Sequence, residues 1–238
     1  MKHFALIGYP LGHSLSKKYF TDKFLAEGID AEYSLLPMER VEDILPHCAN
    51  LVGFNVTIPH KQAIIPLLAN ISKEAKAIGA VNCVKVTPHG LVGYNTDIDG
   101  IRKSLEGVEL KGAKAIVLGT GGASKAVQYV LRTSGAEVKV VSRTEGSAEL
   151  TYNDLSEELI AETDIIVNTT PLGMFPNTDS APALPYSALS VKQTLFDCVY
   201  NPRQTKFLQL GAERGARTID GLTMFLAQAE ASWEIWND

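Results

Sequence analysis

The feature that most constrains the fold is a short apolar run that ends in a glycine cluster, Ala115-Ile116-Val117-Leu118-Gly119-Thr120-Gly121-Gly122-Ala123-Ser124. A segment compatible with a helix follows, so the predicted order is strand, tight turn and helix. Glycines in such a turn let the backbone bend sharply and approach a ligand closely, and the helix N-terminus attracts a pyrophosphate. The stretch therefore predicts the start of a Rossmann-type dinucleotide-binding domain.

A second β-type run, Val138-Lys139-Val140-Val141, comes next and ends at Ser142-Arg143-Thr144. In dinucleotide-binding folds the residue at the end of this strand reads the ribose, and an arginine there suits the 2′-phosphate of NADP. Arg143 therefore predicts NADP as cofactor. The glycine loop departs from the strict G-x-G-x-x-G pattern because Ser124 replaces the third glycine, so a purely structural glycine turn stays an alternative.

Composition indicates an ordinary globular chain, with 238 residues, 45% apolar and 21% charged. The net charge of −5 gives no reason to expect nucleic acid or an anionic membrane as partner. No apolar run approaches a membrane span, and the N-terminal apolar run is too short for a secretory signal. The three cysteines are dispersed, and no ligand lies at metal spacing beside His13 or His60. We therefore expect a cytoplasmic monomer or homodimer without a metal.

Strands alternate with helices along the chain, which predicts an α/β fold with parallel sheets. We expect two domains with a cleft between them. Residues 1–99 are expected to form an open α/β substrate domain, and residues 100–221 a Rossmann-type NADP-binding domain. An amphipathic last helix, 222–238, is expected to pack back on the first domain.

Three local signals predict where helices begin. Ser16 is a plausible N-cap for a helix over 17–27. Pro59 suits the first turn of a helix that follows the strand at 51–56. A later helix is expected to begin at Asn201-Pro202.

Polar side chains gather where the expected strands of the first domain end. The carboxyl ends of strands in an open α/β sheet face one crevice, so these residues are expected to line one site. The clusters are His13-Ser14-Leu15-Ser16, Asn55-Val56-Thr57-Ile58-Pro59-His60-Lys61, Asn82 and Asn95-Thr96-Asp97.

Each of these residues also has a simpler interpretation. Ser16 and Asp97 each suit a helix cap, Lys61 a solvated surface position, and Asn55 and Asn82 turns. Local sequence alone leaves these alternatives open.

Several motifs in fixed order give the chain a specific resemblance to the shikimate dehydrogenase family, over essentially its whole length. Lys17 stands where the family's first motif ends in proline. The matching residues are Gly8, Pro10, His13, Ser14 and Ser16; Asn55-Val56-Thr57-Ile58-Pro59-His60-Lys61; Gly79-Ala80-Val81-Asn82; Gly93-Tyr94-Asn95-Thr96-Asp97; Gly119 to Ser124; Asn168-Thr169-Thr170; Gly173-Met174; Asp197; Tyr200-Asn201-Pro202; and Gly221, Met224 and Gln228.

The resemblance implies a reversible reduction of 3-dehydroshikimate to shikimate by NADPH, a step toward chorismate and the aromatic amino acids. It implies that Lys61 and Asp97 form the catalytic pair. Residues implied to bind the substrate are Ser14, Ser16, Asn55, Thr57, Asn82, Tyr200 and Gln228. Residues implied to bind NADP are Gly119, Thr120, Gly121, Gly122, Ala123, Ser142, Arg143, Thr144, Thr169, Met174 and Gly221.

Three alternatives stay open, and an enzyme acting on amino-shikimate is the least favoured of them. A quinate/shikimate dehydrogenase that uses NAD resembles the same architecture, but Ser16 and the absence of an aspartate after Arg143 favour shikimate and NADP. Glu145 lies near Arg143, so the preference for NADP over NAD is expected to be weaker than usual. A non-catalytic protein that senses a dinucleotide is the alternative from another class. The presence of both Lys61 and Asp97 argues against it.

Overall fold

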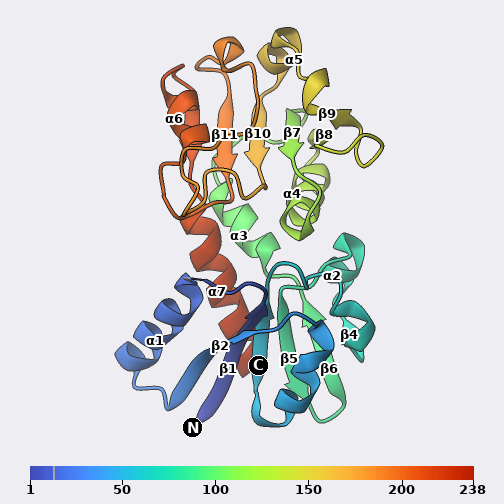
Figure 1. The fold of residues 1–238 in the computed structure, drawn as a ribbon, viewed down its shortest axis with the longest axis vertical. Coiled ribbons are helices and arrows are strands. Elements are labelled where there is room, and N and C mark those ends of the chain that lie inside the picture. The colour runs from blue at the N-terminus through green and yellow to red at the C-terminus, as the bar shows by residue number, and fades with distance from the viewer. Residues whose placement is uncertain (13) are drawn as a thin grey trace. The chain divides into compact units, whose positions relative to one another are not determined.

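The computed structural model describes residues 1–12 and 14–238, and His13 lies outside the described residues. Contacts divide the chain into two compact units, Met1–Thr96 with Ala229–Asp238, and Asp97–Gln228. The last helix, α7 (Leu222–Asn237), supplies its first turns to the second unit and its later turns to the first (Figure 1). The first division, after Thr96, lies three residues before the expected boundary at 99, and the second, after Gln228, lies seven residues beyond the expected boundary at 221. The substrate and cofactor roles of the two units stay predictions.

The first unit is built on a six-stranded mixed sheet. In spatial order its strands are β2 (Ala31–Pro37), β1 (Lys2–Gly8), β3 (Gly53–Val56), β5 (Cys83–Thr87), β6 (Gly90–Tyr94) and β4 (Asn70–Ile71). The β1 strand runs parallel to β2 and β3, whereas β5 is antiparallel to β3 and β6. Asn55 pairs with Cys83, and Cys83 pairs with Tyr94. The end of β3, the start of β5 and the end of β6 therefore lie next to one another, at the same end of the sheet.

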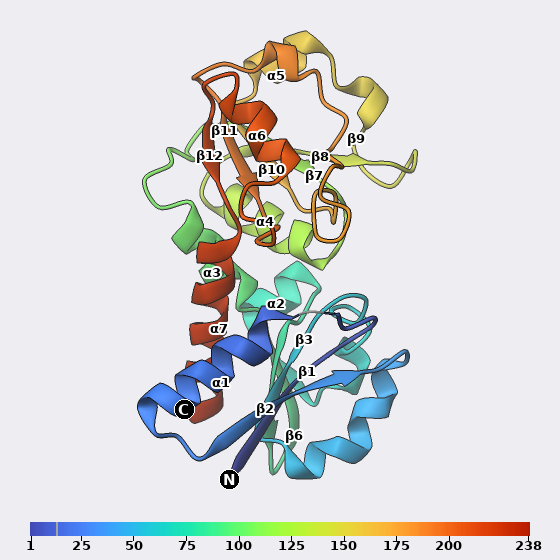
Figure 2. The same ribbon diagram turned by 60° about the vertical axis from the view of Figure 1, so that its left-hand side comes forward.

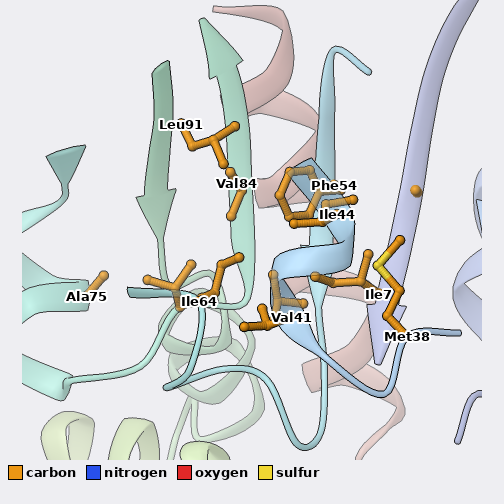
Figure 3. Packing of buried hydrophobic residues seen from close by; sticks show 12 residues of the cluster. Ile7, Met38, Val41, Ile44, Phe54, Ile64, Ala75, Val84 and Leu91 are labelled. Atoms are coloured by element: carbon orange, nitrogen blue, oxygen red, sulfur yellow. The ribbon is translucent and has the colours of Figure 1, made fainter. Parts of the chain in front are cut away.

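Alternating residues of β1 face the two sides of this sheet, as the pleat requires. Phe4 and Leu6 join an aromatic cluster formed with α1 (Leu15–Glu27) and the later turns of α7, which lie on the same side of the sheet (Figure 2). Ala5 and Ile7 join the opposite core, beneath the 3-10 helix η1 (Val41–Asn50) and α2 (Lys73–Ile78). In Figure 3, Val41 and Ile44 of η1 pack near Ile7 and Phe54.

The second unit holds a six-stranded sheet that is parallel throughout. In spatial order its strands are β12 (Arg217–Ile219), β11 (Thr194–Asp197), β10 (Ile165–Asn168), β7 (Lys114–Leu118), β8 (Glu137–Ser142) and β9 (Leu150–Thr151). Strand order reverses at β7, the strand before the glycine loop, which is the order of a Rossmann fold. Both sheets with their helices confirm the expected α/β class. The expectation of parallel sheets was wrong for the first unit, because β5 and β6 form an antiparallel pair and β5 is antiparallel to β3.

Two helices of the second unit, α5 and α6, begin where a short polar residue caps them. Ser156 Oγ accepts from the Leu159 backbone N–H at the start of α5 (Glu157–Glu162). Thr205 Oγ1 does the same for Leu208 in α6 (Lys206–Ala212). The helix after the glycine loop, α4 (Gly122–Thr133), buries one apolar face, as does α3 (Asp97–Ser104).

Three predicted helix starts were wrong. The N-cap of α1 is Ser14 rather than Ser16, because Ser14 Oγ accepts from the Ser16 backbone N–H at 3.2 Å. Turns and a short 3-10 helix, η2 (Ile65–Leu67), follow Pro59, and Pro66 supplies no backbone donor for a longer helix. The helix expected from Asn201-Pro202 begins at Lys206, because Thr205 provides the cap.

No helix among the described residues combines the length and the hydropathy that crossing a membrane requires.

Candidate active site

Residues of three of the predicted polar clusters in the first unit lie where β3, β5 and β6 end or begin, at the same end of the sheet. Thr57 follows β3, Asn82 precedes β5, and Thr96 follows β6 closely. Hydrogen bonds join the strand ends: the Val56 N–H donates to Asn82 O at 2.8 Å, and the Asn82 N–H donates to Tyr94 O at 3.1 Å. The strand register therefore brings together residues that lie far apart in the sequence.

Asn82 is held in one orientation. The Thr96 backbone N–H, which can only donate, reaches Asn82 Oδ1 at 2.7 Å. The Asn82 amide nitrogen consequently faces Thr96 Oγ1, at 3.0 Å. Asn82 is only 3% exposed, and its fixed partners hold the buried amide rigidly in this orientation.

Asn55 is buried and engaged by the protein itself. Tyr33 Oη donates to Asn55 Oδ1 at 2.8 Å. Asn55 Nδ2 donates to Asn82 O at 3.2 Å and to Ser232 Oγ at 2.9 Å, which uses both of its hydrogens. These contacts give Asn55 the geometry of a residue that supports Asn82.

Thr57 and Lys61 occupy the turn after β3, and both are half-buried. This turn passes tightly over the end of β1, because a Cβ on Gly8 would lie 2.4 Å from Thr57 Cγ2. The Lys61 carbonyl accepts from the Val81 backbone N–H at 2.7 Å, which ties the lysine to the segment before Asn82. His60, in the same turn, is 3% exposed and its Nε2 lies 2.6 Å from Met38 O, so it has a structural role.

Ser14 and Ser16 lie at the N-terminus of α1, and both are half-buried. A helix N-terminus carries unpaired backbone donors and favours an anion, which suits the carboxylate predicted there.

Asp97 and Gln228 belong to the second unit, on α3 and α7. The two helices approach closely, because a Cβ on Gly100 would lie 2.4 Å from Met224 O. Asp97 is 4% exposed. Gln228 is half-buried, and its Nε2 donates to Phe225 O at 2.9 Å.

Tyr200 packs on the Phe225 ring at a centroid distance of 5.0 Å, and burial raises the pKa of its hydroxyl.

The loop predicted to bind the pyrophosphate follows β7. Gly119 has φ +109°, and a Cβ there would lie 2.8 Å from Thr169 Oγ1, so the backbone of this loop runs directly beside Thr169. Gly121 is the N-cap of α4 at an ordinary φ of −76°, and a Cβ there would meet nothing within 4 Å. Nothing in the described protein requires glycine at 121, whereas a ligand that approaches the backbone would.

The residues predicted to read the ribose lie at the end of β8 and directly after it. Ser142 is buried and its Oγ accepts from the Thr144 N–H at 3.0 Å, which fixes the turn. Arg143 and Thr144 are exposed. Burial raises the pKa of Tyr152, and the positive charge of Arg143 opposes that rise, so the guanidinium lies near this ring.

Of the residues predicted for the nicotinamide end, Thr169 and Met174 follow β10, and Gly221 lies between β12 and α7. Thr169 Oγ1 donates to Leu118 O at 2.6 Å, and Met174 is 45% exposed. Gly221 is tightly enclosed, because a Cβ there would lie 2.5 Å from Cys198 O.

Sequence reasoning assigned no role to Asn168 and Asp197, which the structure brings together. Asn168 Nδ2 donates to Asp197 Oδ1 at 3.0 Å, and Thr205 Oγ1 donates to Asp197 Oδ2 at 2.5 Å. Burial raises the pKa of Asp197 to about 6, and these hydrogen bonds limit the rise. The pair joins the ends of β10 and β11 below the proposed cofactor loops. The sequence signal that could have found this pair is a polar residue at the end of each of two successive buried strands.

The chain is similar to known proteins over nearly its whole length. Residues 6–84 match the shikimate dehydrogenase substrate binding domain. A shikimate dehydrogenase (NADP(+)) of Carboxydothermus hydrogenoformans is 40% identical over 254 residues, which cover 98% of this chain and 90% of that protein.

Solved structures agree with this comparison. Shikimate dehydrogenase 1 of Peptoclostridium difficile is 37% identical, with a TM-score of 0.88 over 100% of this chain and 92% of that one. Shikimate 5-dehydrogenase of Thermus thermophilus, solved with NADP(H) and shikimate, is 32% identical, with a TM-score of 0.88 over 99% and 93%. The chain belongs to the shikimate dehydrogenase family.

Proposed function

We propose that this chain reduces 3-dehydroshikimate to shikimate with NADPH, and catalyses the reverse oxidation with NADP. The observation that carries the proposal is the polar edge of the first sheet. There the pairing of β3, β5 and β6 brings together the segments that carry Thr57, Asn82 and Thr96, in a chain with near full-length shikimate dehydrogenase relatives. The enzyme is an NADP-dependent oxidoreductase of the aromatic amino acid pathway. We also place it in the cytoplasm, on the basis of its few dispersed cysteines.

We assign proton transfer to Lys61. When a ketone is reduced, its oxygen becomes an alkoxide and needs a proton. An ammonium group delivers that proton, and the resulting amine accepts it back during oxidation of the alcohol. We assign Asp97 as its carboxylate partner, which holds the substrate hydroxyl and the lysine in register for transfer.

We assign recognition of the ring to neutral hydrogen-bonding groups. Thr57, Asn82, Gln228 and Tyr200 have the hydroxyl and amide groups that suit a polyhydroxylated ring. Ser14 and Ser16 are assigned to its carboxylate. The contacts of Asn55 with Tyr33 and Ser232 support an indirect role for Asn55, as the residue that orients Asn82.

The second unit has the residues that fit NADP. The open space beside Gly121 and the close backbone at Gly119 support a pyrophosphate position over residues 119–123. Arg143, with Ser142 and Thr144, is assigned to the 2′-phosphate. Thr169, Met174 and Gly221 are assigned to the nicotinamide end. When bound, NADPH supplies the hydride.

The experiment measures the reduction of NADP or NAD by its absorbance, with shikimate or quinate as the substrate that is oxidised. We expect turnover to be dominated by shikimate with NADP. Comparable turnover with quinate and NAD would instead support a quinate/shikimate dehydrogenase. Absence of turnover in all combinations, with NADP still bound, would identify a dinucleotide-sensing protein and contradict the proposal.

A further inference from the structure

Ser232 lies in the later turns of α7 and is fully buried, at 0% exposure. Its hydroxyl oxygen accepts from Asn55 Nδ2 at 2.9 Å and lies 3.0 Å from Thr96 Oγ1. A single helix residue thereby contacts both β3 and the segment that precedes α3.

The contacts of Ser232 continue into a connected polar network. Tyr33 Oη donates to Asn55 Oδ1. Asn82 contacts Thr96 twice: its Nδ2 donates to Thr96 Oγ1 at 3.0 Å, and its Oδ1 accepts from the Thr96 backbone N–H at 2.7 Å. Every side chain in this chain of contacts is buried. Buried networks of this kind hold their members in a unique arrangement when each is satisfied, and removing one member leaves others unpaired.

The hydrogen-bond donors and acceptors of this network show what the Ser232 hydroxyl contributes to it. Thr96 Oγ1 accepts a hydrogen from Asn82 Nδ2, and Ser232 Oγ accepts one from Asn55 Nδ2. The contact between the two hydroxyls then uses the proton of one of them. Without the Ser232 oxygen, Asn55 loses an acceptor and Thr96 loses the partner that holds its hydroxyl toward Asn82.

We infer that Ser232 is a positioning residue for substrate recognition: it holds Asn82 and Thr96 in place from the last helix. The inference rests on the proposed function, because it acts through Asn82 as a ligand of the substrate and through Thr96, the residue that precedes Asp97. Ser232 is also at position i+4 from Gln228 on α7, so one helix face carries a proposed substrate ligand and this support.

The test compares Ser232→Ala with Ser104→Ala in the shikimate–NADP assay. Ser104 is a matched control, because it is also a buried helix serine, at 7% exposure, and its hydroxyl has no hydrogen-bond partner among residues 1–12 and 14–238. For Ser232→Ala we expect the KM for shikimate to rise roughly tenfold, the scale of one lost hydrogen bond with an unpaired partner. The KM for NADP should not change. Ser104→Ala should leave both KM values unchanged.

A double-variant cycle with Thr96→Val sharpens the test. If Ser232 acts through Thr96, the KM of the double variant should equal that of the worse single variant rather than the product of the two effects. A lower melting temperature with an unchanged KM for shikimate would show that Ser232 is merely structural and overturn the inference. A wild-type protein without shikimate turnover would defeat the proposed function first, and the inference with it.

Discussion

Asn168 donates a hydrogen bond to Asp197 at 3.0 Å, and both side chains are fully buried at the ends of adjacent parallel strands. The carboxylate also accepts from the Val199 N–H at 2.9 Å and from the Thr205 hydroxyl. These donors do not fully offset the loss of solvation, so the pKa of Asp197 stays raised, at about 6.

The raised pKa predicts a pH dependence of stability. The folded pKa exceeds the unfolded value of 3.8, so the native state binds the proton more tightly. The resulting stabilisation is fully present below pH ~4 and is lost as pH rises through about 6, by up to ~3 kcal/mol. Relative to Asp197→Asn, which cannot titrate, the free energy of unfolding of the wild type should fall between pH 4 and 7. Parallel profiles for the two proteins in urea unfolding would contradict this prediction.

Tyr33→Phe should destabilise the first unit. The substitution removes the donor to Asn55 Oδ1 and leaves a buried acceptor unpaired, which costs about 1–3 kcal/mol. The control is Tyr19→Phe, because the Tyr19 hydroxyl contacts Glu230 at a partly exposed position. Thermal unfolding should show the larger loss for Tyr33→Phe. Equal shifts for the two variants would refute a stabilising role for the Asn55 network.

Alanine substitutions at two loop glycines should affect different properties, stability at Gly119 and NADP binding at Gly121. Gly119→Ala forces a side chain to φ +109° against Thr169, so we expect a stability loss of about 1–3 kcal/mol. Gly121→Ala meets no protein atom within 4 Å and should leave the melting temperature unchanged. Its added methyl should nevertheless raise the KM for NADP by at least roughly tenfold, because the ligand approaches the backbone there. Normal NADP binding by Gly121→Ala would show that the cofactor does not approach the backbone of this loop.

Arg143→Ala should reduce selectivity between the two cofactors. Hydrogen bonds to a charged group are worth about 1.5–3 kcal/mol, so the KM for NADP should rise roughly 10- to 150-fold while that for NAD stays the same. Arg132→Ala is the control, since Arg132 is also exposed in the second unit but pairs with Glu149 at 3.3 Å. An equal rise of KM for both cofactors would show that Arg143 does not read the 2′-phosphate.

Sequence patterns predicted the α/β class, the glycine loop and the polar strand ends, because each is a local signal of alternation, glycine or hydrophobicity. The same patterns misplaced the cap of α1, since Ser14 and Ser16 are both competent caps and only the backbone decides between them. The support of Asn82 by Ser232 was not predictable, because it depends on long-range packing of α7 against the sheet. A serine on an apolar helix face carries no sequence signal of its partners.

Lys61 is proposed to transfer the proton in shikimate oxidation, and the kcat of Lys61→Ala tests this role most directly. We expect kcat with shikimate and NADP to fall by about 10²–10⁴, the usual contribution of a general acid–base group. NADP binding, measured by cofactor fluorescence, should stay intact, because the proposed cofactor residues lie in the other unit. A near-normal kcat in this variant would contradict the claim and remove Lys61 from the mechanism.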